Sequence, residues 1–344
     1  MSVATPRNTA IAVIVLAFGV AGFVTYKRSQ HRSMSDEITG RWDDLGGEPW
    51  LLPNLKNARV VQPDRPHSFT EVHAWRKGEG TQISRTREYR LRTNSQRMRG
   101  PEFGAKDTST TRIIAIGDSV THGWGVKESE SYPAQLQMLL EQQGKKIEVL
   151  NAGVPANPVS VMARWCTGIA PSLSPDIILW TRRPSHQSPA PIQGYVQAVR
   201  ACQQATGAKV LVVLPPISTF DVRGSQEWAG ERDSLTQQLQ PSGIGVLELT
   251  DIFRKAQQGR GEVLIDQGNQ VAVLDQETGT TWLTAPKTQH DLHPTIYALF
   301  ENESSVREAL FFDEGHPDAS GFTVFAQAVS EALGPLLSRP PARP

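Results

Sequence analysis

The sequence has 344 residues, enough for one large domain or two small ones with a substantial buried core. Hydrophobic residues make up 38% and charged residues 20%, which is typical of a globular protein and excludes a predominantly disordered chain. Lysine plus arginine and aspartate plus glutamate number 35 each, so the charge balance does not indicate a nucleic-acid partner.

The first predicted element is an uncharged apolar run from Ala10 to Val24, about long enough with its neighbours to span a bilayer. We favour a single-pass membrane anchor over residues 1–32, because no clear small-x-small cleavage site follows the run; a cleavable signal peptide is the alternative. Lys27, Arg28 and Arg32 follow the run, and by the positive-inside rule they place the next domain in the cytoplasm. We nevertheless expect a periplasmic or other extracytoplasmic domain, because large domains after one span are translocated largely regardless of charge.

Residues 33–58 are polar and contain several glycines and prolines, which predicts a tether between the anchor and the folded domain. Residues 59–110 alternate loosely between apolar and polar side chains, which predicts a small β-rich lead-in or cap. The strands expected in this lead-in lie around residues 60–61, 69–75 and 89–92.

From residue 111 to 336 the chain alternates short apolar runs with segments of helical periodicity. The apolar runs predict buried parallel strands over 112–116, 147–150, 176–180, 209–214 and 245–249. The segments between them predict helices over 132–143, 158–169, 192–205 and 228–239, and a last helix follows Gly321. This order predicts a three-layer α/β/α sandwich with a parallel sheet, in which sites form outside the carboxyl ends of the strands.

Residues 256–309 interrupt this alternation and are interpreted as an insertion beside the site. A hairpin is predicted over Val271–Thr284. His290, Asp291 and His293 follow in the same segment, but two histidines and one aspartate in one loop are more often surface residues than metal ligands, and we expect no metal. The proline-rich tail over 337–344 is predicted to be disordered.

The sequence contains two cysteines, Cys166 and Cys202, which excludes a disulfide-framework protein and a zinc-finger array. Both fall on predicted helices of the sheet domain. We favour two buried thiols, with a disulfide in an oxidising compartment as the alternative.

A serine follows the first predicted strand of the sheet, in the motif Gly117-Asp118-Ser119. A serine hydroxyl is a poor nucleophile until a base removes its proton. Between a strand end and a helix start, the Ser119 Oγ is exposed and backbone N–H groups point towards the same place. This position predicts a nucleophile, although the motif alone also fits an ordinary helix cap.

Asp313 and His316 lie three residues apart in a loop before the last predicted helix. This spacing lets the Asp313 carboxylate accept a hydrogen bond from one ring nitrogen of His316 while the other nitrogen faces Ser119. A histidine near a helix start is common by itself. The serine motif and this motif together predict a Ser-His-Asp triad.

These motifs resemble those of the SGNH/GDSL hydrolase family over roughly residues 112–334. Family members place a serine in a Gly-Asp-Ser block after the first strand, and the aspartate and histidine in an Asp-x-x-His-Pro block before the last helix. The resemblance implies the flavodoxin-like fold of these hydrolases, with Ser119 as nucleophile, His316 as base and Asp313 orienting His316. The segment Arg92–Pro101 is also similar to a lead-in of some bacterial membrane-associated members.

The resemblance also implies part of an oxyanion hole. Val149–Pro155 is similar to the block whose glycine N–H serves this role, so Gly153 is the expected donor beside the N–H of Ser119. The Gly-x-Asn-Asp block that usually follows the third strand is absent here. Losing one oxyanion donor raises the barrier by about 3–4 kcal/mol. The absence of the asparagine therefore predicts an enzyme that is slow, differently built, or adapted to an acceptor other than water.

Four residues near the expected place of this block are candidates for the missing role. Ser185 or His186 falls near the position of the asparagine, and Ser185 is the expected third oxyanion donor. Arg182 or Arg183 is able to stabilise negative charge, and Arg182 is also a candidate for substrate binding.

His122 and Trp124 follow the serine closely and are the other candidate substrate-binding residues. We expect both to line the substrate mouth. The alternative is that their side chains pack within the turn that follows Ser119.

The main hypothesis for function is a serine esterase that cleaves an O-acetyl or lipid ester of a small molecule, glycan or lipid, without a cofactor. The choice of ester is implied by the resemblance and not by any residue. The second hypothesis is an O-acyltransferase acting on a cell-envelope glycan, with the altered third block and the insertion shaping an acceptor site. The third is a non-catalytic binding module, against which the intact Ser119, Asp313 and His316 argue.

Overall fold

The computed structural model describes residues 38–63, 86–184, 192–216, 229–260, 262–276, 279, 281–286, 310–311 and 315–337. The predicted anchor over 1–32, the strand expected at 69–75 and the three possible ligands at 290, 291 and 293 lie outside these ranges. Within them, no helix is both long and apolar enough to cross a bilayer.

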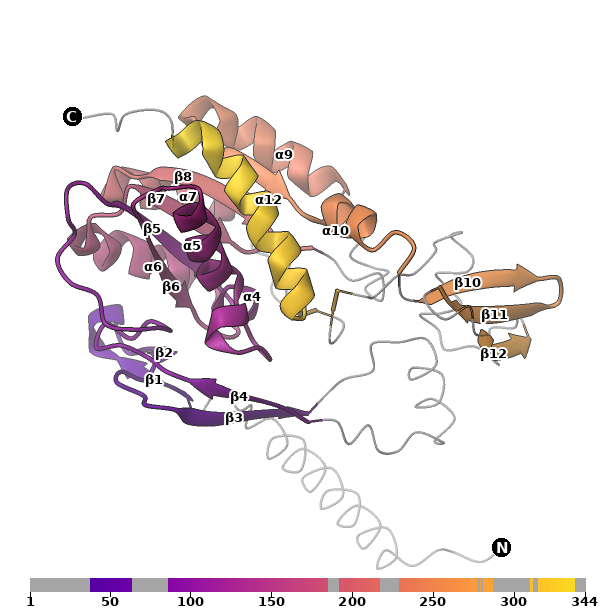
Figure 1. Ribbon diagram of the computed structural model, residues 1–344. Helices are drawn as coiled ribbons and strands as arrows, with labels where there is room; N and C mark the ends of the chain where they lie inside the picture. The colour runs from indigo at the N-terminus through magenta and orange to yellow at the C-terminus, as the bar shows by residue number, and fades with distance from the viewer. Residues whose placement is uncertain are drawn as a thin grey trace, which may run out of the picture.

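The centre of the described structure is a five-stranded parallel sheet with the strand order β6-β5-β7-β8-β9 (Figure 1). Its strands are β5 (Thr111–Gly117), β6 (Ile147–Gly153), β7 (Ile177–Thr181), β8 (Lys209–Leu214) and β9 (Gly245–Glu248). Every residue of β7 is buried, because helices cover both faces of the sheet. At the carboxyl end, Gly117 pairs with Gly153 on one side and Thr181 on the other, so three strands end at one point.

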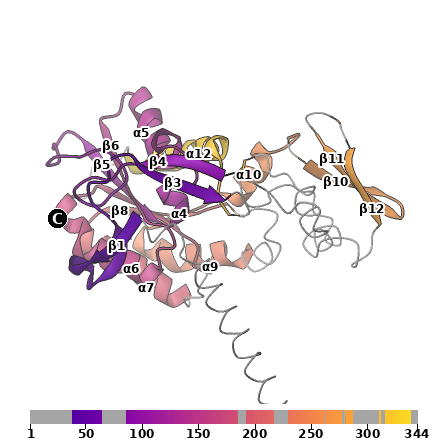
Figure 2. The same cartoon turned by 90° about the horizontal axis from the view of Figure 1, so that it is seen from below.

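Two layers of helices complete the sandwich (Figures 1 and 2). One layer consists of α6 (Val159–Gly168), α7 (Ile192–Thr206) and α9 (Ala229–Leu239), and the other of α5 (Tyr132–Gln142), α10 (Thr250–Ala256) and α12 (Ala319–Leu337). Successive residues of β7 contribute to two separate cores: Trp180 packs with the first layer and Leu179 with the second. The predicted three-layer α/β/α sandwich with a flavodoxin-like strand order is confirmed.

The last helix begins earlier than the sequence predicts. It starts at Ala319 instead of after Gly321, because the Asp318 side chain caps it by accepting a hydrogen bond from the Gly321 N–H at 2.8 Å. The cap places the start of α12 three residues after His316.

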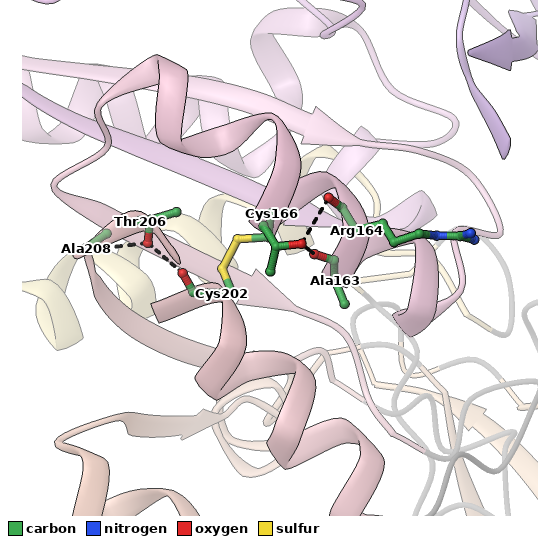
Figure 3. Close-up of a disulfide and its surroundings, with 7 residues drawn as sticks. Ala163, Arg164, Cys166, Cys202, Thr206 and Ala208 are labelled. Atoms are coloured by element: carbon green, nitrogen blue, oxygen red, sulfur yellow. Dashed lines mark hydrogen bonds between the residues drawn. A yellow bond between two sulfur atoms is a disulfide. The ribbon is translucent and has the colours of Figure 1, made fainter. Parts of the chain in front are cut away.

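A disulfide joins Cys166 of α6 to Cys202 of α7, with 5.2 Å between their Cα atoms (Figure 3). The prediction of two buried thiols was therefore wrong. The two helices pack side by side in one layer, and each turns its cysteine towards the other. The disulfide fixes the relative position of the two helices that cover this face of the sheet.

The N-terminal described segment forms an antiparallel hairpin of β1 (Thr39–Trp42) and β2 (Glu48–Leu51). The Trp50 ring is fully buried and stacks on the ring of Trp165 in α6, with centroids 5.5 Å apart. The interpretation of residues 33–58 as a tether therefore fails from residue 38 onward. Its glycines at 46 and 47 have positive φ angles and form a tight turn instead of a flexible linker.

A second antiparallel pair, β3 (Ala58–Pro63) and β4 (Thr86–Leu91), follows the hairpin. The described part of the predicted lead-in is thus β-rich, as expected. From β4 the chain passes along the edge of the parallel sheet, where Arg99 forms an isolated bridge with Asn151 of β6. Tyr89 of β4 is buried in the same core as α6 and α7, so this segment packs directly on the sandwich.

Within the predicted insertion, β10 (Glu262–Gln267), β11 (Gln270–Asp275) and β12 (Thr281–Pro286) form a small antiparallel sheet that projects away from the sandwich (Figures 1 and 2). The predicted hairpin over 271–284 corresponds to β11 and β12. Strand β10 was not predicted. The sequence feature that indicates this strand is the two-residue hairpin turn Gly268-Asn269, in which Gly268 has a φ of 75°.

Candidate active site

Ser119 is the first residue of α4 (Ser119–His122), a single helical turn directly after β5. The Asp118 side chain caps this turn by accepting a hydrogen bond from the Val120 N–H at 3.1 Å. A side chain at Gly117 would collide with Thr121 and with the carbonyl of Thr181, so the sharp strand-to-helix turn needs glycine there. The result is a serine presented at the carboxyl end of the central strand.

His316 reaches this serine from the loop before α12. Its Nε2 lies 2.8 Å from the Ser119 Oγ, although the two residues are 197 positions apart in the sequence. Both side chains are half-buried. The distance is within the range for proton transfer between a nucleophile and a general base. Asp313 lies outside the described residues, so its part in the triad stays a prediction.

Helix α5 holds the start of α12 and thereby the loop that carries His316. The Gln135 Nε2 donates to the carbonyl of Ala319 at 3.3 Å, and the Thr323 hydroxyl donates to Gln135 Oε1 at 2.7 Å. Tyr132 stacks on Phe325 with ring centroids 4.2 Å apart. These contacts fix the helix that follows the predicted base.

The same helix also contacts the turn that carries the nucleophile. The Tyr132 hydroxyl lies 2.7 Å from the Thr181 hydroxyl at the end of β7 and 3.4 Å from the Thr121 hydroxyl in α4. All three groups are buried. Tyr132 therefore connects the nucleophile turn, the central sheet and α12, and this connection explains how two distant sequence motifs meet.

Arg182 does not face a substrate in the described structure. Its Nη1 forms an ion pair with Asp118 Oδ2 at 3.1 Å, and only 4% of Arg182 and 5% of Asp118 is exposed. The Tyr195 hydroxyl donates to the Arg182 carbonyl at 2.7 Å. The predicted role of Arg182 in substrate binding is therefore wrong, because the guanidinium is used inside the protein to hold the residue before Ser119.

Arg183 is equally engaged. Its guanidinium forms ion pairs with Glu248 and Glu231, and it donates to the Thr250 hydroxyl at 2.9 Å and the Pro215 carbonyl at 2.6 Å. Burial lowers the pKa of Arg183, and the two carboxylates oppose that effect. Arg183 thus joins the ends of β7, β8 and β9 and does not supply the stabilisation of negative charge that its position suggested. Ser185 and His186 lie outside the described residues.

His122 is fully buried beneath the nucleophile turn and does not line a substrate mouth. Its Nδ1 lies 3.3 Å from the Gly153 carbonyl, which only accepts, so Nδ1 carries the proton and Nε2 accepts from the Tyr89 hydroxyl at 3.3 Å. Burial, and next the nearby Arg99, hold the pKa of His122 well below its ordinary value. Trp124 is half-buried and packs edge-on against Tyr89. Both residues fit the alternative that they pack the turn.

Gly153 also belongs to the packing beneath this turn. Its N–H donates to the Asn151 Oδ1 at 3.0 Å, and a side chain at this position would collide with the backbone of Thr121 and His122. Since the N–H already has a partner, the structure does not support the expected role of Gly153 in an oxyanion hole. Gly153 instead permits α4 to lie close against β6.

A tight turn that the sequence did not predict follows β6. The Asn157 N–H donates to the Val154 carbonyl at 3.1 Å, and the Val154 N–H donates to the Gly117 carbonyl at 3.1 Å. Ala156, inside this turn, has a φ of 58°, a left-handed conformation that favours glycine. Strained backbone of this kind concentrates at functional sites. The available signal was the Pro155-Ala156-Asn157 segment after the second strand, but alanine gives no indication of a left-handed residue.

Among the described residues, no group of three or more histidine, cysteine, aspartate or glutamate side chains is arranged to hold a metal ion. In chemical terms the arrangement pairs a hydroxyl with an imidazole at the start of a helix, which fits acyl transfer through a serine nucleophile.

A family model described as the GDSL-like Lipase/Acylhydrolase family matches residues 115–321, well over half of the chain, including Ser119 and His316. Solved structures with a similar fold include a putative lipolytic protein of the G-D-S-L family from Desulfitobacterium hafniense DCB-2, with 16% identity over 65% of this chain and 99% of that one and a TM-score of 0.42. A member of the same family from Veillonella parvula DSM 2008 has 15% identity over 64% and 97%, with a TM-score of 0.43. The acetyl xylan esterase AlAXEase has 18% identity over 64% and 99%, with a TM-score of 0.42. No curated protein matches the sequence.

Proposed function

We propose that this chain, which belongs to the GDSL-like lipase/acylhydrolase family and is an ester-cleaving hydrolase, uses Ser119 as its nucleophile and His316 as its general base. The observation that carries the proposal is the distance of 2.8 Å between Ser119 Oγ and His316 Nε2. Proton transfer needs this proximity before any consideration of pKa. Asp313 is proposed to orient the His316 ring and to stabilise the imidazolium ion, in keeping with its position three residues earlier in the sequence.

The reaction proceeds in two steps. Ser119 Oγ attacks the acyl carbonyl carbon while His316 Nε2 takes the hydroxyl proton, and the imidazolium then gives this proton to the departing alcohol oxygen. An acyl ester on Ser119 results. Water then attacks the same carbonyl with His316 again as base, which releases the carboxylic acid and restores the serine hydroxyl.

The negative charge that develops on the carbonyl oxygen needs donors beside the serine. The Ser119 N–H is one candidate, because backbone N–H groups at the start of a helix have no partner within the helix. We propose the Ala156 N–H as a second donor, because the Ala156 turn is bonded to Gly117 and Ala156 is exposed. Ser185 remains the proposed third donor on the basis of its position in the sequence.

The substrate is proposed to be an O-acetyl or lipid ester carried by a small molecule, a glycan or a lipid. The domain is proposed to act outside the cytoplasm, held at a membrane by residues 1–32. The Cys166–Cys202 disulfide supports this location, because disulfides persist in oxidising compartments and are rare in the cytosol. Membrane fractions of cells that express the full chain should contain the protein, and recovery of it in the soluble fraction alone would contradict the anchor.

Hydrolysis of p-nitrophenyl esters over a series of acyl chain lengths tests the function. Wild type is expected to release nitrophenol with a clear preference for one chain length, and Ser119→Ala is expected to release none above background. Equal rates for the two proteins would reject Ser119 as nucleophile. Adding a glycan acceptor distinguishes a hydrolase from an O-acyltransferase, because a transferase forms acylated glycan at the expense of free acid.

A further inference from the structure

The helical turn that carries Ser119, α4, is too short to be stable without contacts from other segments. Helix α4 has four residues and ends at His122, and the next residue, Gly123, has a φ of 80° that turns the chain away. An isolated helix of this length is unstable, and the carbonyl groups at its carboxyl end lack partners within the helix. The direction of the turn, and with it the position of Ser119 Oγ, therefore depends on contacts made by other segments.

Arg99 supplies donors to two of these carbonyl groups and to a third in the loop that follows the helix. Its Nη1 donates to the carbonyls of His122 at 2.6 Å and Gly123 at 2.7 Å, and its Nη2 donates to the carbonyl of Val126 at 2.8 Å. Only 3% of the residue is exposed. A planar guanidinium makes several such bonds in fixed directions at once, and a cation is favourable at the carboxyl end of a helix.

The charge of Arg99 is not balanced by an ion pair in the described part of the chain. No carboxylate there forms an ion pair with its guanidinium, which instead lies over the ring of Tyr89 at 5.0 Å from the centroid. Glu128 and Glu130 act on it only from a distance, and burial lowers the pKa of Arg99. Burying a cation without a carboxylate partner costs free energy. The three hydrogen bonds to backbone carbonyls offset part of this cost.

Arg99 is itself fixed to the sheet. Its backbone N–H donates to the Asn151 carbonyl at 3.1 Å, and the Asn151 Nδ2 also lies 3.4 Å from the His122 carbonyl. The position of the guanidinium is therefore set by β6, the strand beside β5. The turn after Ser119 is held against the sheet through this residue.

We infer that Arg99 is a positioning residue for ester hydrolysis, which fixes the turn after Ser119 and thereby the distance between Ser119 Oγ and His316 Nε2. Arg99 lies before residues 115–321, which the family model matches, so the segment N-terminal to the sheet is part of the catalytic unit. This inference rests on the proposed role of Ser119.

The test compares Arg99→Met with Arg112→Met as a matched control. Arg112 is likewise 3% exposed and donates to two backbone carbonyls, those of Leu173 and Gly104. It differs from Arg99 in its ion pair with Glu148 and in its position at the opposite end of β5 from Ser119. Both variants lose stability. Only Arg99→Met is expected to lower kcat per folded molecule, on the order of 100-fold with little change in KM, because a displacement of about 1 Å costs that much.

Arg99→Lys keeps the charge but not the planar fork, so it is expected to recover part of this loss and to remain roughly tenfold below wild type. If Arg99→Met does not fold, Arg99→Lys takes its place in the comparison with Arg112→Met. A kcat equal to that of Arg112→Met, for whichever Arg99 variant folds, overturns the inference.

Hydrogen–deuterium exchange supplies a readout that needs no activity. Peptides that cover residues 119–126 are expected to exchange faster in the Arg99 variant than in wild type, and at the wild-type rate in Arg112→Met. Unchanged exchange in the Arg99 variant also overturns the inference. A wild-type protein that neither hydrolyses esters nor reacts with a fluorophosphonate rejects the proposed function instead, and the exchange rates then decide the structural role of Arg99.

Discussion

Replacing Arg182 by methionine removes the buried partner of Asp118, the residue that caps the helix of the nucleophile. The two side chains form an ion pair at 3.1 Å and are almost completely shielded from water. Breaking a buried pair from one side leaves an uncompensated charge and costs about 3–5 kcal/mol. Because a typical domain is stable by about 5–15 kcal/mol, this substitution is expected to remove a large part of the free energy of unfolding.

The double variant Asp118→Asn with Arg182→Met tests the physical reason. It removes both charges, while the asparagine Oδ1 is still able to cap α4 by accepting from the Val120 N–H. Replacing both members of a buried pair is often close to neutral, so the double variant should recover most of the stability that Arg182→Met loses. Urea unfolding curves measure all the free energies required.

A free energy of unfolding of Arg182→Met within about 1 kcal/mol of the wild-type value, which is the range of an exposed ion pair, would contradict this prediction. A double variant that is as unstable as Arg182→Met would also contradict it. In the first case the pair is exposed to water, and in the second the loss comes from packing of the Arg182 side chain and not from the charge on Asp118.

Three other substitutions test the fold and its pH dependence. Trp50→Ala should lower the free energy of unfolding by about 3–5 kcal/mol in urea, because the ring is buried against Trp165; no loss would restore the tether interpretation. Cys202→Ala should cost about 4 kcal/mol at 25 °C, and a reducing agent should lower the melting temperature of wild type but not of the variant. Burial lowers the pKa of His122 below 6.5, so below that pH the unfolded chain binds a proton that the folded chain does not, and stability falls. This part of the loss, up to about 1.4 kcal/mol for each pH unit, should be absent from the pH profile of His122→Gln; an identical slope in both proteins would mean that His122 is protonated in the folded state.

The parallel sheet was predictable because its inner strands, β5, β7 and β8, are buried almost throughout. Each of these three strands contains a continuous apolar run, so the local sequence indicates both the type of element and its approximate position. The meeting of Ser119 with His316 was predictable for a topological reason. Ser119 follows the central strand and His316 precedes the last helix. A flavodoxin-like strand order brings both places to the carboxyl edge of the sheet.

The direction of side chains at that edge was not predictable. Arg182 directly follows β7, and His122 lies three residues after Ser119, so both were expected at the site. In the structure both point into the protein, where Arg182 pairs with Asp118 and His122 bonds to the Gly153 carbonyl. Only the packing of neighbouring strands determines whether a polar side chain meets solvent or a buried partner. The N–H of Gly153 presents the same difficulty, since its partner is the side chain of a residue two positions earlier.

The predictions for the N-terminal hairpin and for the two cysteines failed for different reasons. Glycine and proline mark both tight turns and linkers, and the burial of Trp50 depends on a helix more than a hundred residues later. Pairing of Cys166 with Cys202 depends on how two helices are rotated about their own axes, which helical periodicity specifies only loosely. Contacts between distant segments, and not local propensity, decide both features.

Mapping the adduct of a fluorophosphonate probe tests the central claim most directly. Intact-mass and peptide mass spectrometry of the labelled full chain should find one adduct, on Ser119, and its rate of formation should fall roughly 100- to 10,000-fold in His316→Asn. An adduct on another residue, or labelling of Ser119 that is equally fast without the imidazole of His316, would contradict the account.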